Sequence, residues 1–178
     1  MMERRRKVFI SYHKEDQDEV NTFIQNFSDD KSIFIKRILS MTDDIINSND
    51  SKYVMSQIRK KFLQDSTVTI LMIGKCTWAR RYVDWEIKSS LRQGENYLPN
   101  GLLGILLPSV GNKAIPPERL KVNLPKENGT DGYARWYVYP KRKDQLISWI
   151  EDAYQARTTR THLIANSSTM FKNNRTCN

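Results

Sequence analysis

Cysteine is scarce in this sequence, and the motifs that hold metals or phosphates are missing. Its two cysteines, Cys76 and Cys177, lie far apart, so no disulfide framework is expected. With two histidines and no Cys/His cluster, a structural zinc site is not expected. There is no glycine-rich phosphate loop and no serine-hydrolase elbow. We therefore expect neither a bound metal nor a resident cofactor.

Long apolar runs are also missing. No window approaches the roughly 18 apolar residues of a membrane span. The apolar run after the basic start, "VFI", is too short for a signal peptide. A hydrophobic content of 39% and an aromatic content of 10% are typical of a globular protein. The sequence predicts one soluble domain in the cytoplasm.

The net charge of +9 is concentrated at the two ends of the chain. Residues 1–7 carry a net +3 and residues 156–178 a net +4, so the span between them is nearly balanced. Nucleic-acid binding through the basic ends is therefore a weaker alternative for function. The sequence predicts a basic lead over 1–7, a domain over 1–155, and a basic, polar, mobile tail over 156–178.

Short apolar runs alternate with helical stripes along the chain. The clearest strand is "TVTILMI", which is apolar on both faces like a central parallel strand. The clearest helical stripe is Val20, Phe23, Ile24 and Phe27. The expected strands are 7–11, 32–39, 67–73, 101–108 and 135–139, and the expected helices are 16–27, 52–63, 79–92 and 141–157. Residues 109–135 show no clear period and are expected to be loop.

This alternation predicts an α/β fold. We expect a flavodoxin-like, parallel five-stranded sheet of order 2-1-3-4-5 with helices on both faces. Ligands bind such sheets beyond the carboxyl ends of strands 1 and 3, where the order reverses. In this chain those ends are "SYHK" (11–14) and "GKCTW" (74–78).

A glutamate among aromatic residues follows the second of these ends. Glu86 lies at the edge of the helix face marked by Val83, where partial desolvation raises the pKa of a carboxylate. This position makes Glu86 a candidate for chemistry. The alternative is a border glutamate paired with Arg81, Lys88 or a neighbouring helix.

Cys76 and His13 form a second candidate pair. A cysteine on a strand-to-helix turn near basic residues can act as a nucleophile, with a histidine as its base. One cysteine and one histidine give no spacing signal, so the simpler interpretation is that Cys76 is a small packed residue.

The stretches "KVFISYHKED" and "DSTVTILMIGKCTWARRYVDWEI" resemble the TIR domain family. The closer resemblance is to the bacterial branch of Thoeris anti-phage defence, and it covers roughly residues 7–155. "FISY" matches the first strand of TIR domains, and Tyr82 and Glu86 match the aromatic and the glutamate of a later motif. Val83 departs from the cysteine that most TIR domains have there. The long loop 109–135 and the closing "RWYVY" fit the Thoeris branch.

The resemblance implies an enzyme that cleaves the nicotinamide–ribose bond of NAD, with Glu86 as the catalytic residue. Its product would be an ADP-ribose-derived, cyclic signal that activates a separate effector protein, so NAD is a substrate rather than a cofactor. A phage-derived trigger and a second copy of the chain are further expected partners, without membrane or nucleic acid. The implied substrate-binding residues are Phe9, Ser11, Tyr12, His13, Asp43, Trp78 and Tyr82.

Two other functions stay open. Many TIR domains are adaptors, so the chain is alternatively a non-catalytic interaction module. Nucleoside deoxyribosyltransferase-like enzymes share a related α/β layout and use a glutamate nucleophile on N-glycosidic bonds. The "FISY" strand favours the TIR family over that group.

Overall fold

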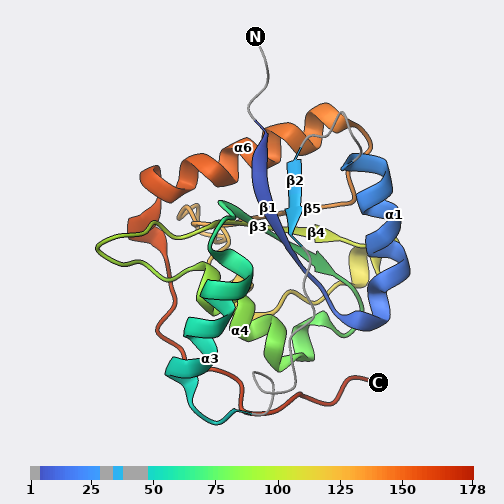
Figure 1. Cartoon of the computed structure of the whole chain (residues 1–178). Coiled ribbons are helices and arrows are strands. Elements are labelled where there is room, and N and C mark those ends of the chain that lie inside the picture. The colour runs from blue at the N-terminus through green and yellow to red at the C-terminus, as the bar shows by residue number, and fades with distance from the viewer. Residues whose placement is uncertain (1–4, 29–33, 38–47) are drawn as a thin grey trace.

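The computed structural model describes residues 5–28, 34–37 and 48–178 (Figure 1). Its strands are β1 (Arg6–Ser11), β2 (Phe34–Arg37), β3 (Val68–Ile73), β4 (Gly101–Leu106) and β5 (Arg135–Tyr137). Its α-helices are α1 (Gln17–Phe27), α3 (Ser51–Ile58), α4 (Arg81–Ser90), α5 (Glu118–Lys121) and α6 (Lys143–Thr159). A π-helical turn, η2 (Arg59–Leu63), continues α3, and a 3-10 turn, η3 (Thr77–Ala79), precedes α4.

The strands form one parallel sheet with the order β2-β1-β3-β4-β5. The predicted α/β architecture, with a parallel sheet and helices in a single domain, is confirmed. After β1 the chain adds β2 on one side, and β3, β4 and β5 follow on the other side, so the strand order reverses between β1 and β3. These two strands are paired with Ser11 opposite Leu71. The carboxyl ends of these two strands therefore lie side by side, where ligands of such sheets bind.

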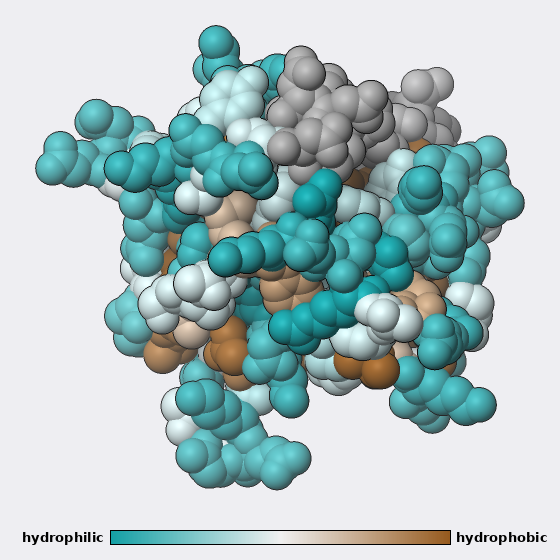
Figure 2. Space-filling view, turned by 90° about the horizontal axis from the view of Figure 1, so that it is seen from below, coloured by the Kyte–Doolittle hydropathy of each residue, from teal (hydrophilic) through white to brown (hydrophobic). Residues whose placement is uncertain are grey.

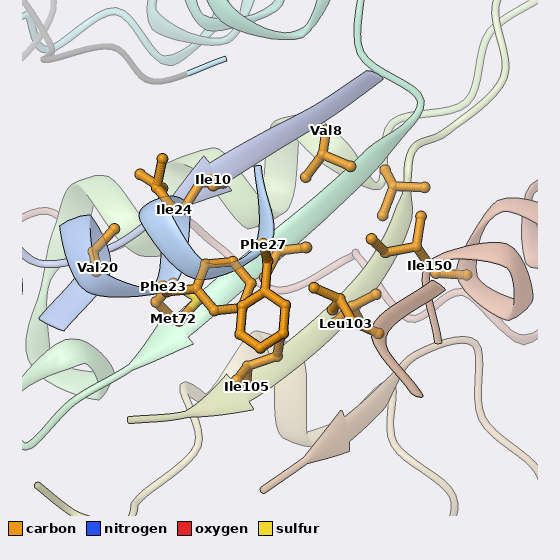
Figure 3. Close-up of a cluster of buried hydrophobic side chains, with 14 of the residues drawn as sticks. Val8, Ile10, Val20, Phe23, Ile24, Phe27, Met72, Leu103, Ile105 and Ile150 are labelled. Atoms are coloured by element: carbon orange, nitrogen blue, oxygen red, sulfur yellow. The ribbon is translucent and has the colours of Figure 1, made fainter. Parts of the chain in front are cut away.

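Helices cover both faces of the sheet, and each face has its own apolar core. One face packs against α1 and α6, whose apolar side chains meet Val8, Ile10 and Met72 of the sheet (Figure 3). The other face packs against α3, α4 and α5. Because strand side chains alternate, Val8 and Ile10 point to the α1–α6 face, and Phe9 and Ser11 point to the α3–α4 face.

The expected loop 109–135 contains a helix that the sequence pattern does not predict. This helix, α5, is only four residues long, too short to show an apolar period. Its Leu120 is fully buried against α4, and its Arg119 is 2% exposed. The prediction of loop throughout 109–135 is therefore wrong at α5.

The expected mobile tail instead lies against the body. Its boundary at 156 falls inside α6, and the segment after α6 runs along α4 (red in Figure 1). The indole Nε1 of Trp85 donates to the carbonyl oxygen of Phe171 at 2.8 Å, and Lys88 Nζ donates to that of Ser168 at 2.8 Å. These contacts are invisible in the sequence because the segment pairs through backbone groups rather than through an apolar stripe.

A buried ion pair fixes this segment, α4 and α5 together. Arg119 Nε lies 2.8 Å from Asp84 Oδ1, and Nη2 lies 3.3 Å from Oδ2. Arg119 also donates to the carbonyl oxygens of Ser168 and Thr169, while Asp84 accepts from the backbone N–H of Phe171. Both charges are thus buried with their hydrogen-bonding groups satisfied, which is what makes such burial tolerable.

The expectation that the cysteines are unlinked is wrong. Cys76, between β3 and α4, forms a disulfide with Cys177, 101 residues later in the sequence. The two cysteines come together because the C-terminal segment runs along α4 to η3. There the backbone N–H of Arg175 donates to the carbonyl oxygen of Ala79. Sequence separation alone gave no sign of this proximity.

Replacing both cysteines, as Cys76→Ser/Cys177→Ser, is expected to lower the free energy of unfolding by about 2–4 kcal/mol, because the bond closes a long loop in the unfolded chain. Urea denaturation of protein purified without reductant measures the change. Reductant should bring the unaltered protein to the level of the double variant and leave that variant unchanged. Two free thiols in the denatured, unreduced protein would contradict the pairing.

None of the helices in the described ranges is both long and apolar enough to cross a lipid bilayer.

Candidate functional site

Glu86 lies on α4 beneath the carboxyl end of β1. Its side chain is 5% exposed, and its Oε2 accepts a hydrogen bond from the hydroxyl of Ser11, the last residue of that strand. Ser11 itself is 1% exposed. The alternative, a border glutamate paired with Arg81, Lys88 or a neighbouring helix, is wrong, because Glu86 bonds to Ser11 of a strand while Arg81 and Lys88 bond to the C-terminal segment.

Burial governs the protonation of this glutamate. Desolvation raises the pKa of Glu86 from 4.5 to about 8, and the Ser11 hydrogen bond, which favours the carboxylate, only partly opposes it. At neutral pH the folded protein therefore holds Glu86 largely as the neutral acid. A cation placed beside it would favour the carboxylate and lower this pKa.

Glu86→Gln is expected to stabilise the protein increasingly as the pH rises from 5 to 8. Over this window the unfolded chain loses the proton of Glu86 and the folded protein keeps it, so stability falls with rising pH. Glutamine removes this cost, and the gain should reach about 1–3 kcal/mol near pH 8. Denaturation curves at several pH values measure the difference, with the exposed Glu127→Gln as control. A difference independent of pH would mean that Glu86 is ionised in the folded protein.

A second hydrogen-bonded pair lies one helical turn before Glu86. The hydroxyl of Tyr82 is 2.6 Å from Nδ1 of His13 and also accepts from the backbone N–H of Lys14 at 3.4 Å. Burial lowers the pKa of His13 and raises that of Tyr82 to about 12, so both groups are neutral at pH 7. The bond therefore runs from the phenol O–H to the unprotonated Nδ1.

Arg80, which was not among the predicted site residues, lies near the His13–Tyr82 pair. Arg80 precedes α4, is partly buried, and donates from Nε to the carbonyl oxygen of Cys76 at 3.4 Å. After burial, the positive charge of Arg80 is the next cause that lowers the pKa of His13. A signal was present in the sequence, since an arginine at a strand-to-helix turn on the ligand-binding edge suits an anionic group.

The structure brings together four of the residues expected to form the site, Ser11, His13, Tyr82 and Glu86. Trp78 lies on η3 just before α4 and is partly exposed. Asp43 lies outside the described residues.

Phe9 and Tyr12 do not lie in the substrate-binding positions expected of them. Phe9 is 1% exposed and belongs to the apolar cluster beneath Ser11. Tyr12 packs on the opposite face of the sheet, and its hydroxyl donates to Gln17 Oε1 at 2.8 Å. Strand alternation turns Tyr12 to the face opposite Ser11, whereas Phe9 shares the face of Ser11 but is covered by apolar residues of α3 and α4.

The second candidate pair is not assembled. Cys76 is held in the disulfide with Cys177, so it offers no thiolate, and His13 bonds to Tyr82 instead. Within the described ranges, no three His, Cys, Asp or Glu side chains come together as a metal site.

The end of the molecule that carries this site is largely polar on its surface. Figure 2 views that end from below, where polar residues cover most of the described surface and apolar patches are small. The buried Ser11–Glu86 pair is therefore an unusual neutral, desolvated spot beneath a polar surface.

Comparison with protein families identifies the family of this chain. The sequence model of the family described as "Thoeris protein ThsB, TIR-like domain" matches residues 9–112. This is more than half of the chain. The chain belongs to this Thoeris ThsB TIR-like family. No curated protein matches the chain.

The matched region of the Thoeris ThsB TIR-like family contains the whole candidate site. Ser11, His13, Tyr82 and Glu86 all fall within residues 9–112. Arg119 and the C-terminal segment that it holds lie beyond the match. The contacts that α4 makes with α5 and with the C-terminal segment therefore involve residues outside the matched range.

Proposed function

We propose that this chain is an anti-phage defence TIR protein that cleaves the nicotinamide–ribose bond of NAD. The proposal depends on one observation: Glu86 is buried, hydrogen-bonded to Ser11, and placed at the carboxyl end of β1 where ligands of this fold bind. Membership of the Thoeris ThsB TIR-like family supports it.

The chemistry needs only one carboxylate. When the ribose–nicotinamide bond breaks, its electron pair goes to the ring nitrogen and nicotinamide leaves as a neutral base, so no general acid is required. Positive charge then develops on the ribose carbon. A carboxylate at Glu86 stabilises that charge and holds the ribose hydroxyls, and its desolvated setting strengthens the interaction.

The bound substrate supplies the condition that ionises Glu86. The pyridinium of NAD is a cation, and a cation beside the carboxyl group favours loss of its proton. Arg80, whose charge acts on His13, is suited to bind the substrate's phosphates. Ser11 orients the carboxylate, while Tyr82 and His13 form its neutral surroundings.

The fate of the ribosyl cation sets the product. Water would give ADP-ribose, whereas an atom of the same molecule would give a cyclic isomer. We propose a cyclic product that activates a separate effector protein, because Ser11 and Glu86 are buried and a ribose bound against them would be shielded from water.

We place this reaction in the cytoplasm, where NAD is available. Disulfides are rare in that compartment, and those found there are often redox-responsive. The Cys76–Cys177 bond is therefore expected to open and close with the redox state of the cell, while the hydrogen bonds of the segment remain.

Incubation of the purified protein with NAD tests the proposal. Free nicotinamide is measured by chromatography, and mass spectrometry separates ADP-ribose from a cyclic isomer. Cells that make the protein should accumulate the same product when infected by phage. No nicotinamide release in either setting would overturn the proposal.

A non-catalytic interaction module is the second candidate, and the exposed edge of the sheet favours it. Trp136 on β5 is 38% exposed and Val138 just after it is 61% exposed. Such apolar side chains beside an open strand edge are suited to association. This function predicts oligomers in solution that are indifferent to Glu86→Gln.

A further inference from the structure

A hollow lined by positive charge lies at the other end of the sheet. It has a volume of about 600 Å³ and is bordered by η2, by the α4–β4 loop and by the C-terminal end of α6 (left in Figure 1). Ser66 and Asn100 in its lining precede β3 and β4, so it opens at the amino ends of these strands. Its cationic residues are Arg59, Lys60, Arg92 and Arg157.

Two of these cations are fixed in place without being neutralised. Arg59 donates to the carbonyl oxygens of Ser89 at 3.2 Å and Leu98 at 3.4 Å, and its guanidinium stacks 3.6 Å from the ring centre of Tyr97. Arg157 Nε donates to the carbonyl oxygen of Pro99 at 2.8 Å. Carbonyl oxygens and rings orient a guanidinium, but they carry no negative charge to balance it.

No carboxylate balances this group within the described part of the chain. The lining contains no Asp or Glu, and none of the four cations forms an ion pair with a described residue. Burial lowers the pKa of Arg59, Tyr97 opposes this shift, and the charge of Arg92 adds to it. Like charges held together in a partly desolvated hollow repel one another, and a bound anion relieves that repulsion.

We propose that this hollow binds a small phosphate-rich anion, the chemistry shared by nucleoside di- and triphosphates and free polyphosphates. Arginine forks are the side chains best matched to phosphate oxygens, and Lys60 adds a movable charge at the rim. The volume lies within the usual range of small-molecule sites. The site is separate from that of the proposed reaction, because it opens at the amino ends of β3 and β4, whereas Ser11, the partner of Glu86, is the last residue of β1 at the carboxyl end of the sheet.

The sequence pattern hides this cluster. Counted along the chain, the span between the basic ends is nearly neutral, and Arg157 belongs to a separate basic stretch. Folding brings Arg157 of α6 beside Arg59 and Arg92, which come from two other elements. The charge excess is therefore local in space although it is dispersed in sequence.

Calorimetric titration of the full chain with ATP and with inorganic pyrophosphate tests the proposal. Lys60→Ala/Arg92→Ala should weaken the binding of both by about tenfold or more, since each side chain can supply a charge-assisted contact. Neither side chain makes a hydrogen bond within the described structure, so the variant should keep its fold, as circular dichroism would verify. Lys113→Ala/Lys126→Ala removes the same charge from exposed sites elsewhere and should leave affinity unchanged.

The outcomes separate the ligand sources. Tighter binding of ATP than of pyrophosphate assigns a nucleotide, and equal binding assigns a free polyphosphate within the same proposal. Equal losses in the two double variants, or no binding of either anion, would overturn it. Binding of a single-stranded oligodeoxythymidylate without binding of either small anion would also overturn it, in favour of a nucleic-acid surface.

Discussion

Replacing Glu86 by glutamine is expected to lower the rate of nicotinamide release by about 100-fold or more. The amide is close in shape to the carboxyl group and can still accept the hydrogen bond of Ser11, but it cannot become negative when the ribose carbon becomes positive. The loss should appear in kcat, because the missing interaction is made chiefly in the transition state. Initial rates of nicotinamide release over a range of NAD concentrations measure it.

The folding measurements make this result unambiguous. Glu86→Gln is expected to be at least as stable as the unaltered protein at pH 8, so its loss of activity cannot come from unfolding. Glu127→Gln, which removes an exposed carboxylate, should retain full activity. Full activity of Glu86→Gln would disprove the role of this residue, whereas no activity of the unaltered protein would leave the interaction module as the better account.

Arg119→Met is expected to lower the free energy of unfolding by about 3–5 kcal/mol. Methionine fills similar space but leaves Asp84 buried without its counter-charge, and it removes the donors that hold Ser168 and Thr169. The C-terminal segment should then detach from α4. Urea denaturation measures the stability, and limited proteolysis near residues 165–171 reports the detachment.

A double variant separates the charge from the packing. Asp84→Asn/Arg119→Met removes both charges and should recover much of the loss, because no unpaired charge stays buried. Lys121→Met, on the exposed side of the same short helix, should change stability by less than about 0.5 kcal/mol. A loss below about 1 kcal/mol in Arg119→Met would show that the pair does not hold the segment.

The sequence predicted the parts of the molecule that depend on local patterning. The apolar run at Val68–Ile73 and the stripe of α1 identify their elements because burial imposes a period on each. The alternation of these elements in turn places Glu86 near the end of β1. Glu86 was found because the reversal point of the sheet and the helix after β3 follow from this order.

Most of the parts that were missed depend on distant contacts. Tyr12 is the exception, because the alternation of the strand, a local rule, turns it to the face opposite Ser11. Arg119 and Asp84 are 35 residues apart, and α5 is too short to show a period. The Cys76–Cys177 pair likewise requires knowledge of where the C-terminal segment returns, which no local pattern contains.

The path of the C-terminal segment orders events during synthesis of the protein. Domains generally fold as units as they leave the ribosome, yet α4 obtains the partners of Trp85 and Arg119 only from residues near 168–171. Until that stretch emerges, Asp84 of the nascent chain can pair with Arg119 but lacks the backbone N–H of Phe171. The indole of Trp85 likewise lacks the carbonyl oxygen of Phe171. Glu86, on the same helix, therefore reaches its final surroundings only after residues 168–171 have been translated, so products truncated before them should lack a finished candidate site.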